Sequence, residues 1–178
     1  MFDEIDKLID KLFGIHTTTD VNDTARSSII DYYNYQPTTY AFLEEIFTKY
    51  PFSATDYFVD FGCGRGRVLI MASFMGCMNN VGVEINPILV EDAICNLKKW
   101  NDYCKTNGLQ ICNFEVINVD AMDINISPIW NKFFFFKPFS KEICIRIIIR
   151  VIESVEADNR RVMFFFLSSA KRPHQMDK

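Results

Sequence analysis

The chain has little of what marks a membrane, secreted or zinc-binding protein. Its 178 residues contain only two histidines, and its six cysteines are scattered without a C-x-x-C pair. This pattern favours reduced thiols over a disulfide framework, and we predict no metal site. The N-terminus opens with acids instead of a basic and then apolar segment, and no apolar run approaches the ~20 residues of a membrane span. We therefore expect a cytoplasmic protein with no membrane partner.

Clustered positive charge is also scarce. The net charge is −4, and no basic stripe of the kind that follows a phosphate backbone is present. Nucleic acid is therefore a weaker substrate hypothesis than a protein or a small molecule. It stays open, because the charge inside a pocket can oppose the net charge.

Only seven glycines occur, and three of them stand at alternate positions in the segment from Asp60 to Arg67. The segment follows a short apolar run, so it predicts a strand, a tight turn that a ligand can approach closely, and a helix. A dinucleotide fingerprint requires G-x-G-x-x-G. Here the third glycine, Gly66, comes one residue early, and Arg67 stands where a small residue is needed. This disfavours NAD and leaves a nucleotide-dependent oxidoreductase as the weakest alternative.

The D-x-G-x-G-x-G pattern resembles the first motif of the S-adenosylmethionine-dependent methyltransferases with a Rossmann-like fold, in particular a small bacterial class. The resemblance implies S-adenosylmethionine as the cofactor. Gly62, Gly64 and Gly66 would shape the loop, and Asp60 would order it and face the methionine amine. Cys63 lies inside the loop but has no histidine near it in the sequence, so we interpret it as a small residue that fits the turn and not as a nucleophile.

Two further apolar runs end in acids. Glu84, followed by Ile85, lies about 20 residues past the glycines, where an acid accepts hydrogen bonds from ribose hydroxyls in doubly wound sheets. Residues 114–119 lead to Asp120 and Ala121, which resemble the family's adenine-binding position, with an acid for the exocyclic amine and an apolar neighbour for the ring. Each acid alone is also explained as a cap of the next helix or turn. Taken together and in this order along the chain, the acids at 60, 84 and 120 favour one cofactor site.

Upstream of the glycines, residues 35–40 read Tyr-Gln-Pro-Thr-Thr-Tyr. They resemble a segment of the small bacterial methyltransferases that would close over the methionine end of the cofactor, through Tyr35, Thr38 and Tyr40. The alternative is a helix that Thr38 or Thr39 caps and whose aromatic residues pack in the core. The two roles are compatible.

Four consecutive phenylalanines at 133–136 predict a strand that is buried on both faces of a parallel sheet. Lys137, Pro138 and Phe139 follow, where amine-directed methyltransferases carry Asn-Pro-Phe or Asp-Pro-Pro-Tyr. By this resemblance, Pro138 and Phe139 would border the methyl acceptor, which is unidentified.

Lys137 departs from the family pattern. A lysine side chain accepts no hydrogen bond, and its charge is unfavourable beside a sulfonium. Either Lys137 points out of the pocket, or the acceptor is an oxygen or an anionic group, or methyl transfer is weakened or lost. The last outcome would leave a non-catalytic S-adenosylmethionine-binding protein.

Strands and helices alternate along the chain, which implies a doubly wound, mostly parallel α/β sheet with helices on both faces in three αβα layers. The resemblance implies about five strands in the order 3-2-1-4-5. Apolar residues recur at helical spacing in 2–13 and predict an amphipathic N-terminal helix. Further helices are predicted over 68–75, from Pro87 with Asn86 as its cap, and over 141–154. The fifth strand is predicted over 161–167.

We expect one domain over 1–178, with N-terminal helices and a lid in 1–50, a cofactor-binding core in 51–167 and a polar tail in 168–178. Related methyltransferases usually add two more strands beside the fifth. Without them the fifth strand would be an apolar sheet edge, which invites pairing. This predicts either a homodimer through that edge or a shortened version of a longer ancestor.

Overall fold

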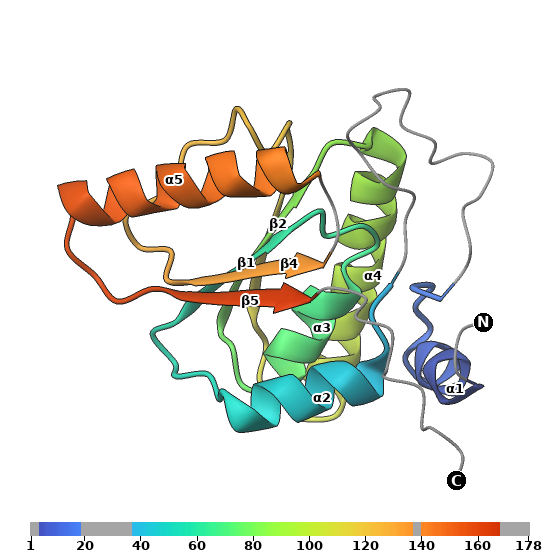
Figure 1. Cartoon of the computed structure of the whole chain (residues 1–178). Coiled ribbons are helices and arrows are strands. Elements are labelled where there is room, and N and C mark those ends of the chain that lie inside the picture. Colours follow the sequence, from blue (N-terminus) through green and yellow to red (C-terminus); the bar gives the residue numbers. More distant parts are fainter. Residues whose placement is uncertain (1–3, 19–36, 137–139, 168–178) are drawn as a thin grey trace, which may run out of the picture.

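Five parallel strands form the centre of this computed structural model, which describes residues 4–18, 37–136 and 140–167 (Figure 1). Their order across the sheet is β3-β2-β1-β4-β5, which confirms the order expected from the sequence. The strands are β1 Tyr57–Phe61, β2 Asn79–Glu84, β3 Asn113–Asn118, β4 Lys132–Phe136 and β5 Met163–Leu167. Because every pairing is parallel, the carboxyl ends of all five strands meet at one edge of the sheet.

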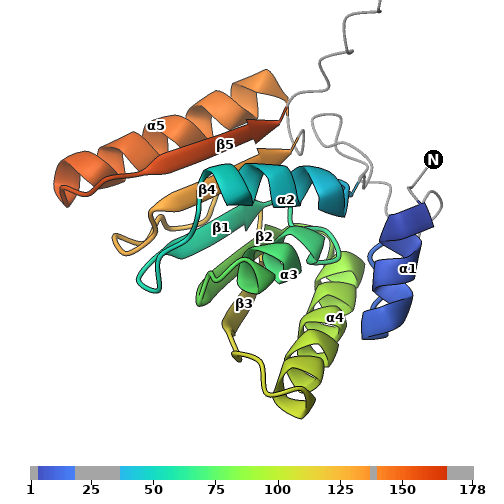
Figure 2. The ribbon, with the colours of Figure 1, turned by 90° about the horizontal axis from the view of Figure 1, so that it is seen from below.

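Helices cover both faces of the sheet (Figure 2). One face packs against α2, α3 and α4, and the other packs against α5 and the segment that leads into β4. The helices are α1 Glu4–Phe13, α2 Tyr40–Lys49, α3 Arg67–Phe74, α4 Pro87–Thr106 and α5 Lys141–Ala157. Successive side chains of a strand point to opposite faces, so Phe134 lies in the first core while Phe133 and Phe135 lie in the second. The prediction of a strand buried on both faces is confirmed.

The helix starts follow local chemistry. At α4, the Asn86 side chain accepts a hydrogen bond from the Ile88 amide at 3.0 Å, as predicted for a cap that precedes a proline. At α2, Thr39 is the N-cap residue, one of the two predicted, but the expected side-chain hydrogen bond does not form. The Thr38 hydroxyl has no partner among the described residues.

The N-terminal helix forms as predicted, but only part of its predicted apolar face packs against the core. Ile5, Leu8 and Leu12 are 59%, 66% and 66% exposed, whereas Asp6 and Asp10 are buried. Residues four apart share one face of a helix. The helix is therefore turned so that the two carboxylates point into the molecule together with Ile9 and Phe13, which pack against the core.

β5 is an edge of the described sheet and pairs only with β4. Phe166 is 51% exposed there, so the described part of the chain leaves apolar surface at this edge, as the sequence predicts. Among the described helices, none is long and apolar enough to cross a membrane.

Candidate functional site

The turn between β1 and α3 is held in shape by its own backbone. The amides of Gly62 and Cys63 both donate to the Val83 carbonyl of the neighbouring strand, at 2.8 and 3.1 Å, and the Gly66 amide donates to the Cys63 carbonyl at 2.9 Å. Gly62, Gly64 and Gly66 have φ angles of 78°, 53° and 82°. Side chains are strained in this left-handed region, which is why glycine recurs at every second position.

Glu84 fastens this turn to the end of β2. One carboxylate oxygen accepts from the Gly64 amide at 3.0 Å, and the other accepts from the Asn86 amide at 2.9 Å. Burial raises the pKa of Glu84, and hydrogen bonds from the amides of Asn86, Gly64 and Ile85 partly offset that effect. Each oxygen can accept a second hydrogen bond, so the carboxylate still has capacity for hydroxyl donors.

Asp60 lies near the carboxyl end of β1, on the face of the sheet that carries α3. It is 2% exposed, and its Oδ2 atom has no hydrogen-bond partner among the described residues. Burial, followed by the charge of Glu84, raises the pKa of Asp60 well above its ordinary range. A buried, unsatisfied carboxyl group is costly to keep. It is therefore suited to a cationic or hydrogen-bond-donating ligand.

Cys63 packs inside the turn. Burial and the carboxylates of Asp60 and Glu84 raise the pKa of its thiol well above the ordinary range. Since a nucleophilic cysteine reacts as the thiolate, this environment is unsuited to nucleophilic catalysis. The thiol instead fills the space beside Gly82, where an added Cβ would lie 2.6 Å from the Cys63 sulfur.

The end of β3 lies against the end of β2. Asn118 donates to the carbonyls of Glu84 and Ile85, at 2.9 and 3.0 Å. Two residues further, the Asp120 side chain accepts from the Met122 amide at 2.8 Å in a local turn, and Ala121 is buried in the core beside α5. Asp120 therefore follows two residues after Asn118, whose side chain contacts the end of β2, and one of its carboxylate oxygens is used in the local turn.

The predicted N-terminal residues lie in a buried polar network. The Tyr40 hydroxyl donates to Asp10 at 3.0 Å and lies 3.1 Å from the Thr17 hydroxyl. Burial and the nearby Asp10 charge raise the Tyr40 pKa. Thr38 is buried, and its carbonyl accepts from Arg67 at 3.0 Å. Of the other predicted site residues, Tyr35, Lys137, Pro138 and Phe139 lie outside the described residues.

Sequence reasoning missed Asn96 on α4. Its side chain accepts from the His16 amide at 3.0 Å and donates to the Arg65 carbonyl at 3.0 Å, so it joins the N-terminal segment to the glycine turn. These three segments are far apart in the sequence, and no spacing pattern connects them.

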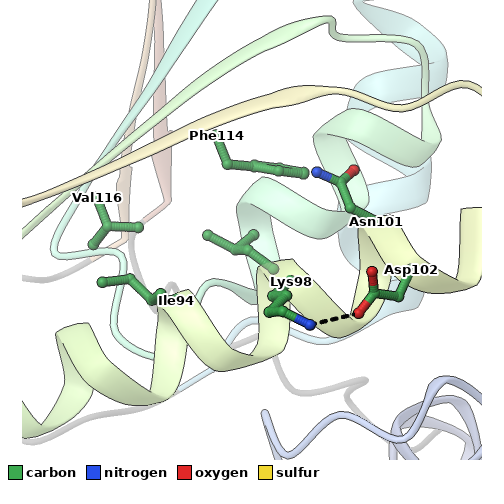
Figure 3. A pocket seen from close by; sticks show the side chains of 7 residues that line it. Ile94, Lys98, Asn101, Asp102, Phe114 and Val116 are labelled. Carbon is green, nitrogen blue, oxygen red and sulfur yellow. Dashed lines mark hydrogen bonds and ion pairs between the residues drawn. The ribbon is translucent and has the colours of Figure 1, made fainter. Parts of the chain in front are cut away.

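A separate pocket of about 290 Å³ lies between α4 and β3 (Figure 3). None of the predicted site residues lines it. Its polar side chains already have partners, because Lys98 pairs with Asp102 at 2.8 Å and Asn101 contacts the backbone of Cys112. We assign no function to this pocket.

The sheet order and the glycine turn at the carboxyl ends of the strands are those of the Rossmann-like methyltransferase fold. The matching family model is that of the histone methylation protein DOT1, and it covers residues 19–127. The chain belongs to this family. A comparison with curated proteins finds no match.

Several solved structures with similar folds are methyltransferases. A protein of Pyrococcus horikoshii described as a candidate RNA methyltransferase is 16% identical, with a TM-score of 0.56 over 86% of this chain and 68% of that one. Phosphoethanolamine N-methyltransferase 1 of Haemonchus contortus is 13% identical, with a TM-score of 0.52 over 74% of this chain and 26% of that one.

An RNA methyltransferase of Salinibacter ruber, solved with S-adenosyl-L-homocysteine, is 26% identical over 57% of this chain and 60% of that one, with a TM-score of 0.46. The chain thus spans less than two thirds of the length of several structures that it matches.

Proposed function

We propose that the chain binds S-adenosylmethionine at the glycine turn and transfers its methyl group to a protein acceptor. The observation that carries the proposal is the Asp60 carboxyl group, which is buried under the turn with one oxygen unsatisfied among the described residues. The methionine part of S-adenosylmethionine carries an ammonium group, which would supply the missing donor and the missing positive charge. The residues present therefore fit this cofactor.

Each part of the site has a distinct task in this proposal. Asp60 and the Thr38 hydroxyl, both buried with an unsatisfied oxygen, would hold the amino acid end. Glu84 would accept from ribose hydroxyls with its remaining lone pairs, and Asp120 with Ala121 would bind the adenine. Ile85 lies beside Glu84 and would border the ribose.

The cofactor would supply an activated methyl group on a sulfonium. What remains for the protein is to hold the donor and the acceptor in line and close together, which is a large contribution to such a transfer. Pro138 and Phe139 would border the acceptor, next to the end of β4.

A protein acceptor is favoured by the family, whose name refers to histone methylation. The net charge of −4 is consistent with a basic protein partner and opposes general binding to nucleic acid. We also propose an intracellular, reducing location, since all six cysteines are unpaired.

One specific observation supports a second candidate. Lys137 stands where an acceptor-binding side chain is expected, and lysine accepts no hydrogen bond. A protein that binds S-adenosylmethionine without methyl transfer would account for this substitution.

Calorimetry with S-adenosylhomocysteine tests the cofactor without knowledge of the acceptor. We expect binding, and we expect Glu84→Ala to raise the Kd by at least about tenfold, because it removes an acceptor and the clamp on Gly64. Glu115→Ala on the exposed part of β3 is the matched control and should leave the Kd unchanged. Binding of NAD in place of S-adenosylhomocysteine would contradict the proposal.

A labelled-methyl assay with histones and with cell extract then separates the two candidates. Transfer to a protein supports the methyltransferase. Tight binding of S-adenosylhomocysteine without transfer to any component would support the non-catalytic alternative.

A further inference from the structure

Arg67 is a buried arginine directly beside the glycine turn. It occupies the first position of α3, immediately after Gly66, and is 2% exposed. Its Nη1 atom donates to the Asp6 carboxylate at 2.6 Å and to the Thr38 carbonyl at 3.0 Å, and its Nε atom donates to the Thr17 hydroxyl at 2.8 Å. One guanidinium therefore joins α1, the segment after α1 and the segment before α2 to the start of α3.

The inward face of α1 completes this network. Asp6 also accepts from the Tyr40 amide at 3.1 Å. Asp10, one turn later, accepts from the Thr17 hydroxyl at 2.7 Å, from the Thr18 amide at 2.7 Å and from the Tyr40 hydroxyl at 3.0 Å. Figure 2 shows α1 beside α4, from which Asn96 holds His16 to the glycine turn on a second side.

Stability alone does not explain such a buried network. Burying an ion pair costs desolvation energy that its attraction often only repays, and apolar residues of similar size often do as well. The network does, however, fix several chain segments in one arrangement, because both carboxylates and the Nε and Nη1 atoms of Arg67 have directional partners. That arrangement includes the glycine turn and Thr38, which the proposed function assigns to the cofactor.

We propose that Asp6 and Arg67 are positioning residues of the cofactor site. They hold Thr38 and the start of α3 in fixed relation, so that α1 is part of the binding site although neither residue contacts the cofactor. This inference rests on the proposed function for the role of Thr38 and of the turn.

The chain offers a matched control at the opposite ends of the strands, where β1 and β4 begin. Asp56 and Lys132 form a second buried ion pair at 2.9 Å, near the start of β1 and β4, and Lys132 also donates to the Pro51 carbonyl. Asp6→Asn and Asp56→Asn make the same chemical change in two buried pairs, because an amide retains only one acceptor oxygen. Only the first pair adjoins the glycine turn.

The experiment compares these two variants with the wild type by calorimetry with S-adenosylhomocysteine, by thermal unfolding and by amide hydrogen exchange of residues 62–67. We expect both variants to lower the Tm. Asp6→Asn should also raise the Kd by about tenfold and speed exchange in the glycine turn, whereas Asp56→Asn should keep the Kd within about twofold. If Asp6→Asn does not fold, Arg67→Lys replaces it, since lysine keeps the charge but loses the fork of donors.

The inference is overturned if the variant of the Asp6–Arg67 pair leaves the Kd and the exchange of the turn as in the wild type, or if Asp56→Asn weakens binding equally. Failure of the proposed function gives a different result. The wild type would then not bind S-adenosylhomocysteine, and faster exchange of the turn in the Asp6→Asn variant alone would still support the positioning role.

Discussion

Asp60 and Glu84 place two carboxyl groups at neighbouring strand ends in a buried environment, and their pKa values are raised in consequence. Burial is the main cause for both, and for Asp60 the charge of Glu84 adds to it. In the absence of a cation, the protonated form of Asp60 is favoured. A ligand ammonium reverses this preference, so ligand binding and loss of the Asp60 proton are linked.

The linkage gives a prediction about pH. The ammonium binds best to ionised Asp60, so the Kd for S-adenosylhomocysteine should fall as the pH rises through the raised pKa of Asp60. Calorimetry in buffers of different ionisation enthalpy should detect release of a proton on binding at lower pH. Asp60→Asn should weaken binding by about 10- to 100-fold and abolish this pH dependence. A Kd with the same pH dependence in Asp60→Asn and in the wild type would show that another group is responsible.

Stability should respond with the opposite sign. The raised pKa means that the folded state holds a proton that the unfolded chain releases near its ordinary pKa of about 3.9. This contribution is present below that pKa and is lost as the pH rises through the folded pKa of Asp60. Without ligand, Asp60→Asn should therefore unfold at a higher Tm than the wild type at neutral pH, and the difference should shrink in acid. A lower Tm for Asp60→Asn at neutral pH would contradict the buried, unsatisfied carboxyl group.

At the scale of single residues, the sequence indicates which residues are candidates for the site better than it indicates what their side chains contact. The acid at position 84 follows from its distance past the glycines, but its hydrogen bond to the Gly64 amide does not, because spacing along the chain gives no direction for a side chain. Arg67 is visible in the sequence only as a residue too large for a dinucleotide motif. Its partners lie up to 61 positions away on α1.

The helices and strands were predictable because their patterns are local, and the exception is the orientation of α1. Helical spacing predicts the element, and it forms. Which side is buried depends on what α1 packs against, and here the buried guanidinium of Arg67 attracts Asp6. Periodicity of apolar residues carries no information about such a distant charge.

The contact between β2 and the glycine turn leads to a prediction for Gly82. An alanine Cβ there would lie 2.6 Å from the Cys63 sulfur and 2.9 Å from Leu69 Cδ1. Alanine normally suits a strand better than glycine, but here Gly82→Ala must displace the turn or α3. We expect a loss of about 1–3 kcal/mol in the free energy of unfolding, together with weaker binding of S-adenosylhomocysteine.

Denaturant unfolding of a double-mutant cycle tests the cause. Cys63→Ala removes the sulfur that clashes first, so Gly82→Ala should be less destabilising in that background. Equal destabilisation in both backgrounds would mean that the contact with Cys63 is not the source.

On the scale of the whole molecule, one group of exposed apolar side chains lies on β5 and α5, at the β5 side of the sheet. Phe166 on β5 and Ile145, Ile149 and Ile152 on α5 are all about half exposed. The edge of β5 also presents backbone groups that no described strand pairs. An edge strand can pair with its own copy in antiparallel fashion, and a register centred on Phe165 would set Phe164 opposite Phe166 of the second copy. Such cross-strand aromatic pairs are favourable.

We therefore predict that this 178-residue chain forms a dimer through β5, which sedimentation equilibrium measures directly. Phe166→Lys should shift the chain to the monomer, because a charge at an exposed edge opposes strand pairing. Leu8→Lys is the matched control, since Leu8 is also apolar and exposed, at 66% against 51% for Phe166, but lies on α1, and it should leave the dimer intact. A wild-type monomer, or a dimer that Leu8→Lys dissociates and Phe166→Lys does not, would move the interface away from β5. Because β4 separates β5 from β1, after which the glycine turn follows, the Kd for S-adenosylhomocysteine should be the same in the monomeric variant as in the wild type.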